Sequence, residues 1–142
     1  MADINIELKQ IGNMKLHAVG NSGNDIYFDT SEKHGGDNSA ATPFETFLST
    51  VIACSAMDII AILRKMKIDY SSFKIKLSSD RTIEHPKIPR FIDIEYILEG
   101  KNIPMENFEK AVQLSQDKYC SVSAVVKKAG IPVNWKCTVI GE

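Results

Sequence analysis

The sequence lacks a long run of charge of one sign, and this narrows the classes of partner that it can bind. Lys and Arg total 17 against 18 Asp and Glu, so the formal net charge is −1. Proteins that bind nucleic acid or an anionic membrane surface by electrostatics need a concentrated basic patch. We therefore expect neither a nucleic acid nor a membrane as partner.

Several motifs that carry common chemistries are also missing. There is no Gly-Lys-Ser/Thr loop for phosphates, no closely spaced cysteine pair of the metal-binding type, and no Gly-x-Ser-x-Gly segment. The three histidines, His17, His34 and His85, lie far apart in the sequence. The sequence therefore predicts neither a bound metal nor a bound cofactor.

Cysteine is scarce, and so are features of export. The chain begins with alternating acidic and apolar residues, without the basic start and apolar core of a signal peptide. We therefore expect a cytoplasmic protein. Its three cysteines are an odd number, and in a reducing compartment none should form a permanent disulfide, although transient pairing stays open.

What is present is a pattern of short strands followed by a long helix. Apolar residues alternate with polar ones over residues 1–29, which predicts two or three antiparallel strands, and the polar segment 30–42 should be an exposed, mobile loop. Thr42 and Pro43 then start a helix over 43–67. Its apolar stretch is interrupted by Asp58 and is shorter than the roughly 20 residues that a bilayer span needs, so we expect a core helix. Because it is apolar on nearly every face, a second subunit should cover part of it.

The second half of the chain reads as a hairpin, two helices and a strand. Alternation predicts a hairpin over 70–99, helices from 104 to 117 and from 120 to 129 within 104–130, and a last strand within 131–142. With 142 residues, the chain has the length of a single domain. The order of elements predicts an α+β fold with antiparallel sheets.

The three cysteines differ in their expected surroundings. Cys137 shares the apolar phase of the last strand with Trp135 and should be a buried, inert thiol. Cys54 lies in the middle of the long helix, where burial would silence it unless a cation or hydrogen-bond donor activates it. Cys120 falls at the start of a helix, where the dipole favours a thiolate. Electrostatics alone therefore favours Cys120 as the low-pKa thiol.

Three segments together resemble one known family. They are Pro43-Phe44-Glu45, Cys54 to Ile60, and Lys118-Tyr119-Cys120-Ser121-Val122, with further similarity at Ser79-Asp80-Arg81. These segments resemble the OsmC/Ohr family of osmotically induced and organic hydroperoxide resistance proteins, closest to its YhfA-like branch. The resemblance covers most of the chain in the same order.

The resemblance implies an intertwined homodimer in which the long central helices pack at the subunit interface between sheets. It also implies that Cys54 is the peroxidatic thiol, which becomes a sulfenic acid, and that Cys120 resolves it to a disulfide. The substrate would be a small apolar hydroperoxide, and an external dithiol would reopen the disulfide without metal or cofactor.

Two features of the peroxidase branch differ here. No arginine precedes Arg64, although the resemblance implies one in the N-terminal hairpin, where only Lys15 is near. We therefore consider Arg81 as a substitute cation, with an ion-paired surface arginine as the alternative. Glu45 follows Phe44 rather than the proline, so it is either the glutamate of the site or an acid that stabilises the first helical turn.

Asp58 lies on the same helical face as Cys54 and should raise the pKa of its thiol. A second function therefore stays open, namely non-catalytic binding of a small molecule or redox sensing on the same fold. A third is a purely structural thiol pair. Hydroperoxide reduction through Cys54 and Cys120 is the hypothesis that the motifs favour.

Overall fold

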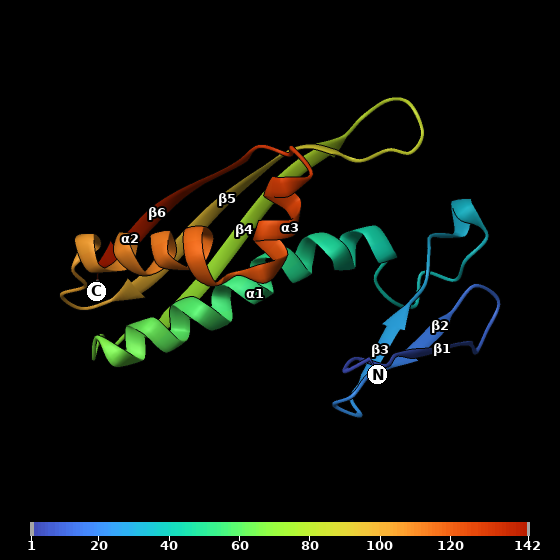
Figure 1. The fold of residues 1–142 in the computed structure, drawn as a ribbon, viewed down its shortest axis with the longest axis horizontal. Coiled ribbons are helices and arrows are strands. Elements are labelled where there is room, and N and C mark those ends of the chain that lie inside the picture. The colour runs from blue at the N-terminus through green and yellow to red at the C-terminus, as the bar shows by residue number, and fades with distance from the viewer. Residues whose placement is uncertain (1, 142) are drawn as a thin grey trace. The chain divides into compact units, whose positions relative to one another are not determined.

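The computed structural model describes residues 2–141 and divides into two compact units, residues 1–48 and 49–142. The boundary falls inside the long helix α1, Pro43–Lys65 (Figure 1). The prediction of one domain over 1–142 stays a prediction.

The first unit is built on a three-stranded antiparallel meander, as the alternation predicts. Its strands are β1 (Glu7–Gln10), β2 (Leu16–Val19) and β3 (Asp25–Phe28), in the order β1-β2-β3. Ala18 is the buried residue of β2, while every residue of β1 is exposed. All four residues of this edge strand are therefore accessible to solvent.

The loop after β3 is more structured than its composition predicts. It contains a 3₁₀ turn over Glu32–His34, and Asp29 accepts hydrogen bonds from both the backbone N–H and the hydroxyl of Ser39, at 3.0 and 2.6 Å. At Gly36, a Cβ atom would lie 2.2 Å from the Thr30 carbonyl oxygen, so only glycine fits there. The Asp29 carboxylate and the close packing of Gly36 against Thr30 together hold the loop in one conformation. Hydrophobic periodicity cannot predict such contacts, because they involve polar groups and backbone atoms.

Helix α1 begins where the sequence predicts and ends two residues earlier. The Thr42 hydroxyl accepts a hydrogen bond from the Glu45 N–H at 3.1 Å, which is an N-cap. Every fourth residue from position 51 to 63 is buried, which forms one stripe: Val51, Ser55, Ile59 and Leu63. The chain leaves the helix through Lys67, whose φ of 58° is left-handed.

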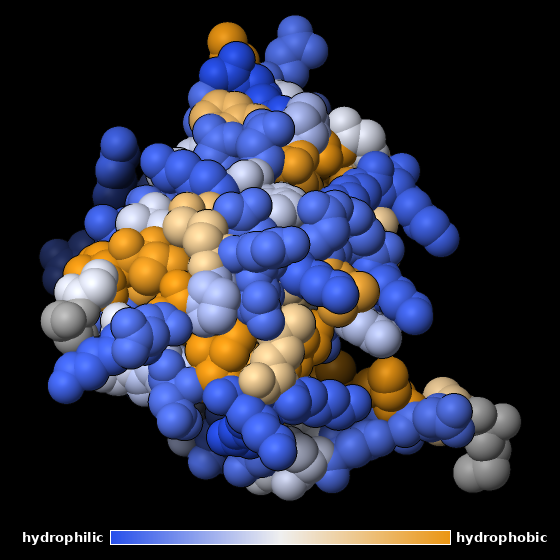
Figure 2. All heavy atoms as spheres, turned by 90° about the vertical axis from the view of Figure 1, so that its left-hand side faces the viewer, coloured by the Kyte–Doolittle hydropathy of each residue, from blue (hydrophilic) through white to orange (hydrophobic). Residues whose placement is uncertain are grey.

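Apart from its buried stripe, α1 is poorly covered. Over an 18-residue window its mean hydropathy is 2.0, yet only 22% of that window is buried within the chain. By length and composition alone it could cross a membrane, a test that core helices also pass. On the face of the second unit that Figure 2 shows, apolar side chains reach the surface in patches between hydrophilic ones. Much of the apolar surface of α1 is thus exposed within the single chain.

The second unit contains a three-stranded sheet in the order β4-β5-β6. Strands β4 (Ser72–Arg81) and β5 (Pro89–Gly100) form the predicted antiparallel hairpin. Strand β6 (Val133–Gly141) instead pairs with β5 in parallel, so the expectation of purely antiparallel sheets is corrected. The α+β class is confirmed. The parallel pairing arises because the helices after β5 return the chain to the start of the sheet, as a crossover connection does.

The crossover contains α2 (Met105–Leu114), a π-helical turn over Ser115–Tyr119, and α3 (Ser121–Lys128). The predicted helix over 104–117 therefore ends early and passes into the wider turn. Apolar residues of β5 and α2 make the centre of the core: Ile92, Ile94, Tyr96, Leu98, Phe108, Ala111 and Val112. The π-helical turn leads the chain from this core directly to Cys120.

Candidate functional site

The fold brings Cys54 and Cys120 together, as the resemblance implies. Cys54 lies in the middle of α1, and Cys120 lies directly before α3. The two sulfur atoms and a carboxylate oxygen of Asp58 all lie within 4.8 Å of one another. All three residues belong to the second unit. Both thiols are free, so this arrangement is the reduced state of the pair.

Helix α3 directs its N-terminus at the Cys54 sulfur. Partial burial and the Asp58 carboxylate raise the pKa of Cys54, whereas hydrogen bonds from the Val122 backbone N–H, the Cys120 thiol and the Ser121 hydroxyl lower it. The hydrogen bonds outweigh the other effects, so the pKa of Cys54 lies below its ordinary value of 9.0. Donors at a helix start favour a thiolate in the same way as a positive charge.

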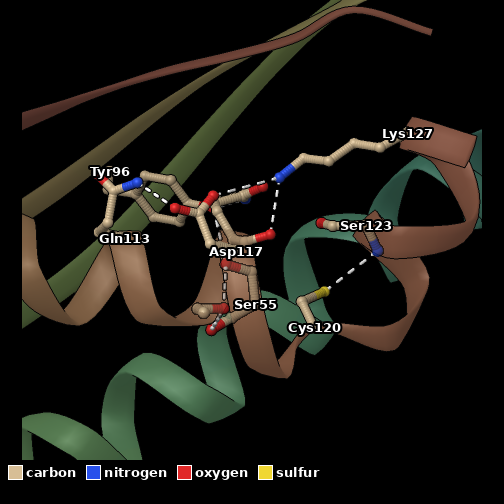
Figure 3. Close-up of polar contacts among 9 residues, drawn as sticks. Ser55, Tyr96, Gln113, Asp117, Cys120, Ser123 and Lys127 are labelled. Carbon is tan, nitrogen blue, oxygen red and sulfur yellow. Dashed lines mark hydrogen bonds and ion pairs between the residues drawn. The ribbon is translucent and has the colours of Figure 1, made fainter. Parts of the chain in front are cut away.

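Cys120 is held differently, and the electrostatic argument that favours it as the low-pKa thiol is not supported. Its sulfur caps α3 by accepting a hydrogen bond from the Ser123 N–H at 3.3 Å (Figure 3). However, the residue is only 3% exposed, and burial together with the neighbouring Cys54 sulfur raises its pKa. The same helix start therefore serves two thiols and activates the more accessible one.

Behind the thiols lies a buried polar network that sequence reasoning missed. The Ser115 hydroxyl lies 3.0 Å from both the Ser55 hydroxyl and an Asp58 oxygen. Ser55 in turn shares a 2.7 Å hydrogen bond with the Tyr96 hydroxyl, to which Gln116 also donates at 2.6 Å. The sequence contains one signal of this network, namely Ser55 at a buried position of α1 between apolar residues, because a buried hydroxyl needs a hydrogen-bond partner.

A lysine ties α3 to the turn before it. Lys127 donates to the Gln116 carbonyl at 2.7 Å and lies 3.9 Å from the Asp117 carboxylate (Figure 3). Within the π-helical turn, the Cys120 N–H donates to the Ser115 carbonyl at 2.8 Å. Such turns often occur at functional sites, because they redirect the side chains that follow. Here the turn fixes Cys120 between α1 and α3.

The two weaker candidates take other positions. Glu45 forms a reciprocal capping box with Thr42, whose backbone N–H lies 3.2 Å from a Glu45 carboxylate oxygen. This agrees with the alternative interpretation, an acid at the first turn. Arg81 is exposed at the end of β4, opposite Pro89 and after a β-bulge. Roles of Glu45 and Arg81 in catalysis stay predictions.

The third cysteine lies apart from the pair, on β6. Burial, together with the Glu109 carboxylate, raises the pKa of Cys137 to about 12. Its side chain is half-buried rather than fully buried. At neutral pH it is a neutral thiol, which is consistent with the inert role that the sequence predicts.

Comparison with known proteins finds a family match that includes both cysteines. A family model described as OsmC-like protein matches residues 36–136, which include both thiols. The chain belongs to the OsmC-like family. The match begins inside the loop before α1 and reaches into β6, so most of the family domain lies in the second unit.

The chain is also similar to individual proteins. The chain is 35% identical over 108 residues to Protein YhfA of Escherichia coli K12, a match that covers 76% of this chain and 78% of that protein. A crystal structure of a hypothetical protein from Aquifex aeolicus VF5 is 30% identical, with a TM-score of 0.84 and coverage of 100% of this chain and 99% of that one.

An organic hydroperoxide resistance protein from Legionella pneumophila shares the fold. Its TM-score is 0.61 at 17% identity, and the match covers 99% of each chain. A protein named for organic hydroperoxide resistance therefore has a similar fold, and at 17% identity the comparison concerns the fold alone.

Proposed function

We propose that this protein reduces organic hydroperoxides with Cys54 as the attacking thiol and Cys120 as the resolving thiol. The observation that carries the proposal is the position of the Cys54 sulfur, which lies within 4.8 Å of the Cys120 sulfur at the start of α3. The start of α3 lowers the pKa of Cys54, and the short distance between the sulfurs places a second thiol where it can form a disulfide.

The chemistry needs nothing from the protein beyond these two thiols. The Cys54 thiolate attacks one peroxide oxygen, the O–O bond breaks, and the alkoxide leaves and takes up a proton as the alcohol. Cys54 is then a sulfenic acid. The Cys120 sulfur attacks the Cys54 sulfur, the S–S bond forms, and the hydroxyl leaves with the Cys120 proton as water. An external dithiol restores both thiols by exchange.

The two sulfurs need to move only a short way between these states. A disulfide holds its sulfurs about 2.05 Å apart, so the pair closes by less than about 3 Å. Rotation of side chains covers that distance. Because Cys120 is buried and has the higher pKa, it keeps its proton and meets the oxidant after Cys54.

Apolar side chains next to the thiols support an apolar substrate. Met57, one turn after Cys54 on α1, is 74% exposed, and Tyr119, next to Cys120, is 51% exposed. Water-exposed apolar side chains beside a reactive thiol favour an alkyl or aryl hydroperoxide over hydrogen peroxide, which offers nothing for them to bind.

The same surface supports a homodimer. Most of the apolar surface of α1 is uncovered within one chain, and Val125 on α3 is 66% exposed. Burial of such residues against a second copy contributes about 25 cal/mol per Å² of apolar area removed from water. Sedimentation of the wild type should give a dimer mass, and Met57→Glu should shift the equilibrium toward the monomer.

A redox-sensing or binding role without turnover is the second candidate. It is favoured by the Asp58 carboxylate, which lies among the thiols and raises the pKa of Cys54. The two candidates differ in turnover, because a sensor forms the disulfide once while an enzyme consumes hydroperoxide in proportion to added dithiothreitol.

The test is intact mass with peptide mapping after one equivalent of cumene hydroperoxide, with Cys137→Ser as the matched control. The wild type and the control should lose two hydrogens per chain as a Cys54 to Cys120 disulfide. Cys120→Ser should carry a sulfenic acid that can be trapped on Cys54, whereas Cys54→Ser should stay unmodified. An unmodified wild type would contradict hydroperoxide reduction and redox sensing and would favour non-catalytic binding, whereas a sulfenic acid on Cys120 would reverse the assignment.

A further inference from the structure

Asp58 makes the thiol pair a group of three potential metal ligands. Cys54 and Asp58 are four residues apart and therefore project from the same face of α1, while Cys120 approaches from the start of α3. One ligand atom of each lies within 4.8 Å of the other two. Among residues 2–141, no other three side chains of Cys, His, Asp or Glu bring their ligand atoms within 4.8 Å of one another.

The spacing suits a tetrahedral ion with little movement. With Zn–S bonds of about 2.3 Å, tetrahedral zinc holds two sulfurs roughly 3.8 Å apart. The present separations exceed that figure by 1 Å or less. Rotation about the side-chain bonds of Cys54 and Cys120 can bring the two sulfurs closer by this amount, because each sulfur lies at the end of a rotatable side chain.

The donor set selects the class of ion. Two sulfurs and one carboxylate oxygen are ligands for zinc and other thiophilic cations, whereas magnesium and calcium need oxygen ligands throughout. Both thiols must lose their protons to bind, and the bound cation itself favours that loss.

A second observation supports a built site rather than a chance cluster. The Asp58 carboxylate is oriented from behind by the Ser115 hydroxyl at 3.0 Å, and Ser115 is fully buried and also bonded to Ser55. Metal-binding carboxylates characteristically have such supporting hydrogen bonds. The other Asp58 oxygen stays available to a ligand, and Cys54 and Asp58 are both half-buried, so an ion can enter.

We propose that the reduced protein binds one Zn²⁺ per chain through Cys54, Asp58 and Cys120, with the fourth position left to water or a small ligand. Binding uses both thiolates, so zinc and the disulfide exclude each other. The bound ion therefore shields the thiols from oxidants and alkylating reagents. This inference does not depend on hydroperoxide turnover, because metal binding can be measured with no peroxide present.

The experiment is equilibrium dialysis of the reduced chain against Zn²⁺, with the ultraviolet thiolate-to-metal absorption of Cd²⁺ as a second probe. We expect one ion per chain for the wild type and for Cys137→Ser, which leaves the site intact. Cys54→Ser and Cys120→Ser should lose the ion and the cadmium absorption. Asp58→Asn should weaken Zn²⁺ binding about tenfold or more, whereas Asp69→Asn, an exposed acid outside the site, should not.

A measurement on the wild type alone guards against variants that fold poorly. With Zn²⁺ present, iodoacetamide should label Cys54 and Cys120 more slowly, and oxidation to the disulfide should abolish zinc binding. Zinc that binds equally to the oxidised chain, or to Cys54→Ser, would overturn the site. Binding unchanged in Asp58→Asn would remove the carboxylate from it.

Discussion

The sulfur of Cys54 lies within 4.8 Å of the sulfur of Cys120, although Cys54 lies in the middle of α1 and Cys120 caps the start of α3. This contact joins the middle of α1 to the first turn of α3. The backbone N–H of Val122 in α3 lowers the pKa of Cys54 without an arginine, which is the cation that the N-terminal hairpin of this chain lacks. Helix geometry therefore supplies part of the activation that a positive side chain would otherwise provide.

The three thiols should react in a fixed order with iodoacetamide. Cys54, whose pKa is lowered, should be labelled first as pH rises toward 9.0, followed by Cys120, whose pKa is raised. Cys137, with a pKa of about 12, should stay unlabelled. Peptide mapping of the reduced, metal-free chain between pH 6 and about 9 measures the order. The unfolded chain is the control, where all three should react alike.

Removal of the carboxylate next to Cys54 should make this thiol more reactive. Asp58→Asn takes away a negative charge that raises the pKa of Cys54, so the thiolate fraction at neutral pH should rise. Because the carboxylate is a minor cause of the shift, we expect less than the tenfold change of about one pKa unit. The measurement is the alkylation rate of Cys54 in chelator, and Asp69→Asn, at an exposed position outside the site, should leave it unchanged. A slower rate would contradict this assignment.

Tyr96 should matter for stability through its hydroxyl rather than its ring. Tyr96→Phe keeps the buried ring but leaves Ser55 and Gln116 without their shared partner. A buried polar group left unsatisfied costs about 1–3 kcal/mol of unfolding free energy. Urea denaturation should show this loss, whereas Tyr119→Phe, at an exposed position, should change stability by no more than about 0.5 kcal/mol. Equal effects would argue against the network.

The loop before α1 should open in acid. Hydrogen bonds from the Ser39 hydroxyl and backbone and from the Thr30 N–H lower the pKa of Asp29 to about 2 from 3.8. Its ionised form thus stabilises the folded loop above pH 3.8, and that contribution disappears as the pH falls toward 2. Hydrogen exchange of the Ser39 amide, by NMR, should lose protection over this range. In Asp29→Asn the protection should already be low at pH 6.

Much of the fold follows from periodicity and punctuation. The alternation of β1 to β5 and the Thr42-Pro43 start of α1 predict elements that the structure confirms, because both signals are local. The parallel pairing of β6 was not predictable in this way. An isolated strand carries no information about its direction relative to a neighbour, which the path of α2 and α3 decides.

The sequence by itself determined the long apolar helix, because residue types at fixed local spacing encode it, and its motifs resemble a family in which two thiols meet. Only the tertiary structure decided which thiol is activated. The dipole argument for Cys120 considered its own helix alone, whereas the N–H groups of α3 also reach Cys54, and burial raises the pKa of Cys120. The same packing brings Asp58 to both sulfurs. Hydrogen bonds and desolvation act through space, so no spacing along the chain could reveal them.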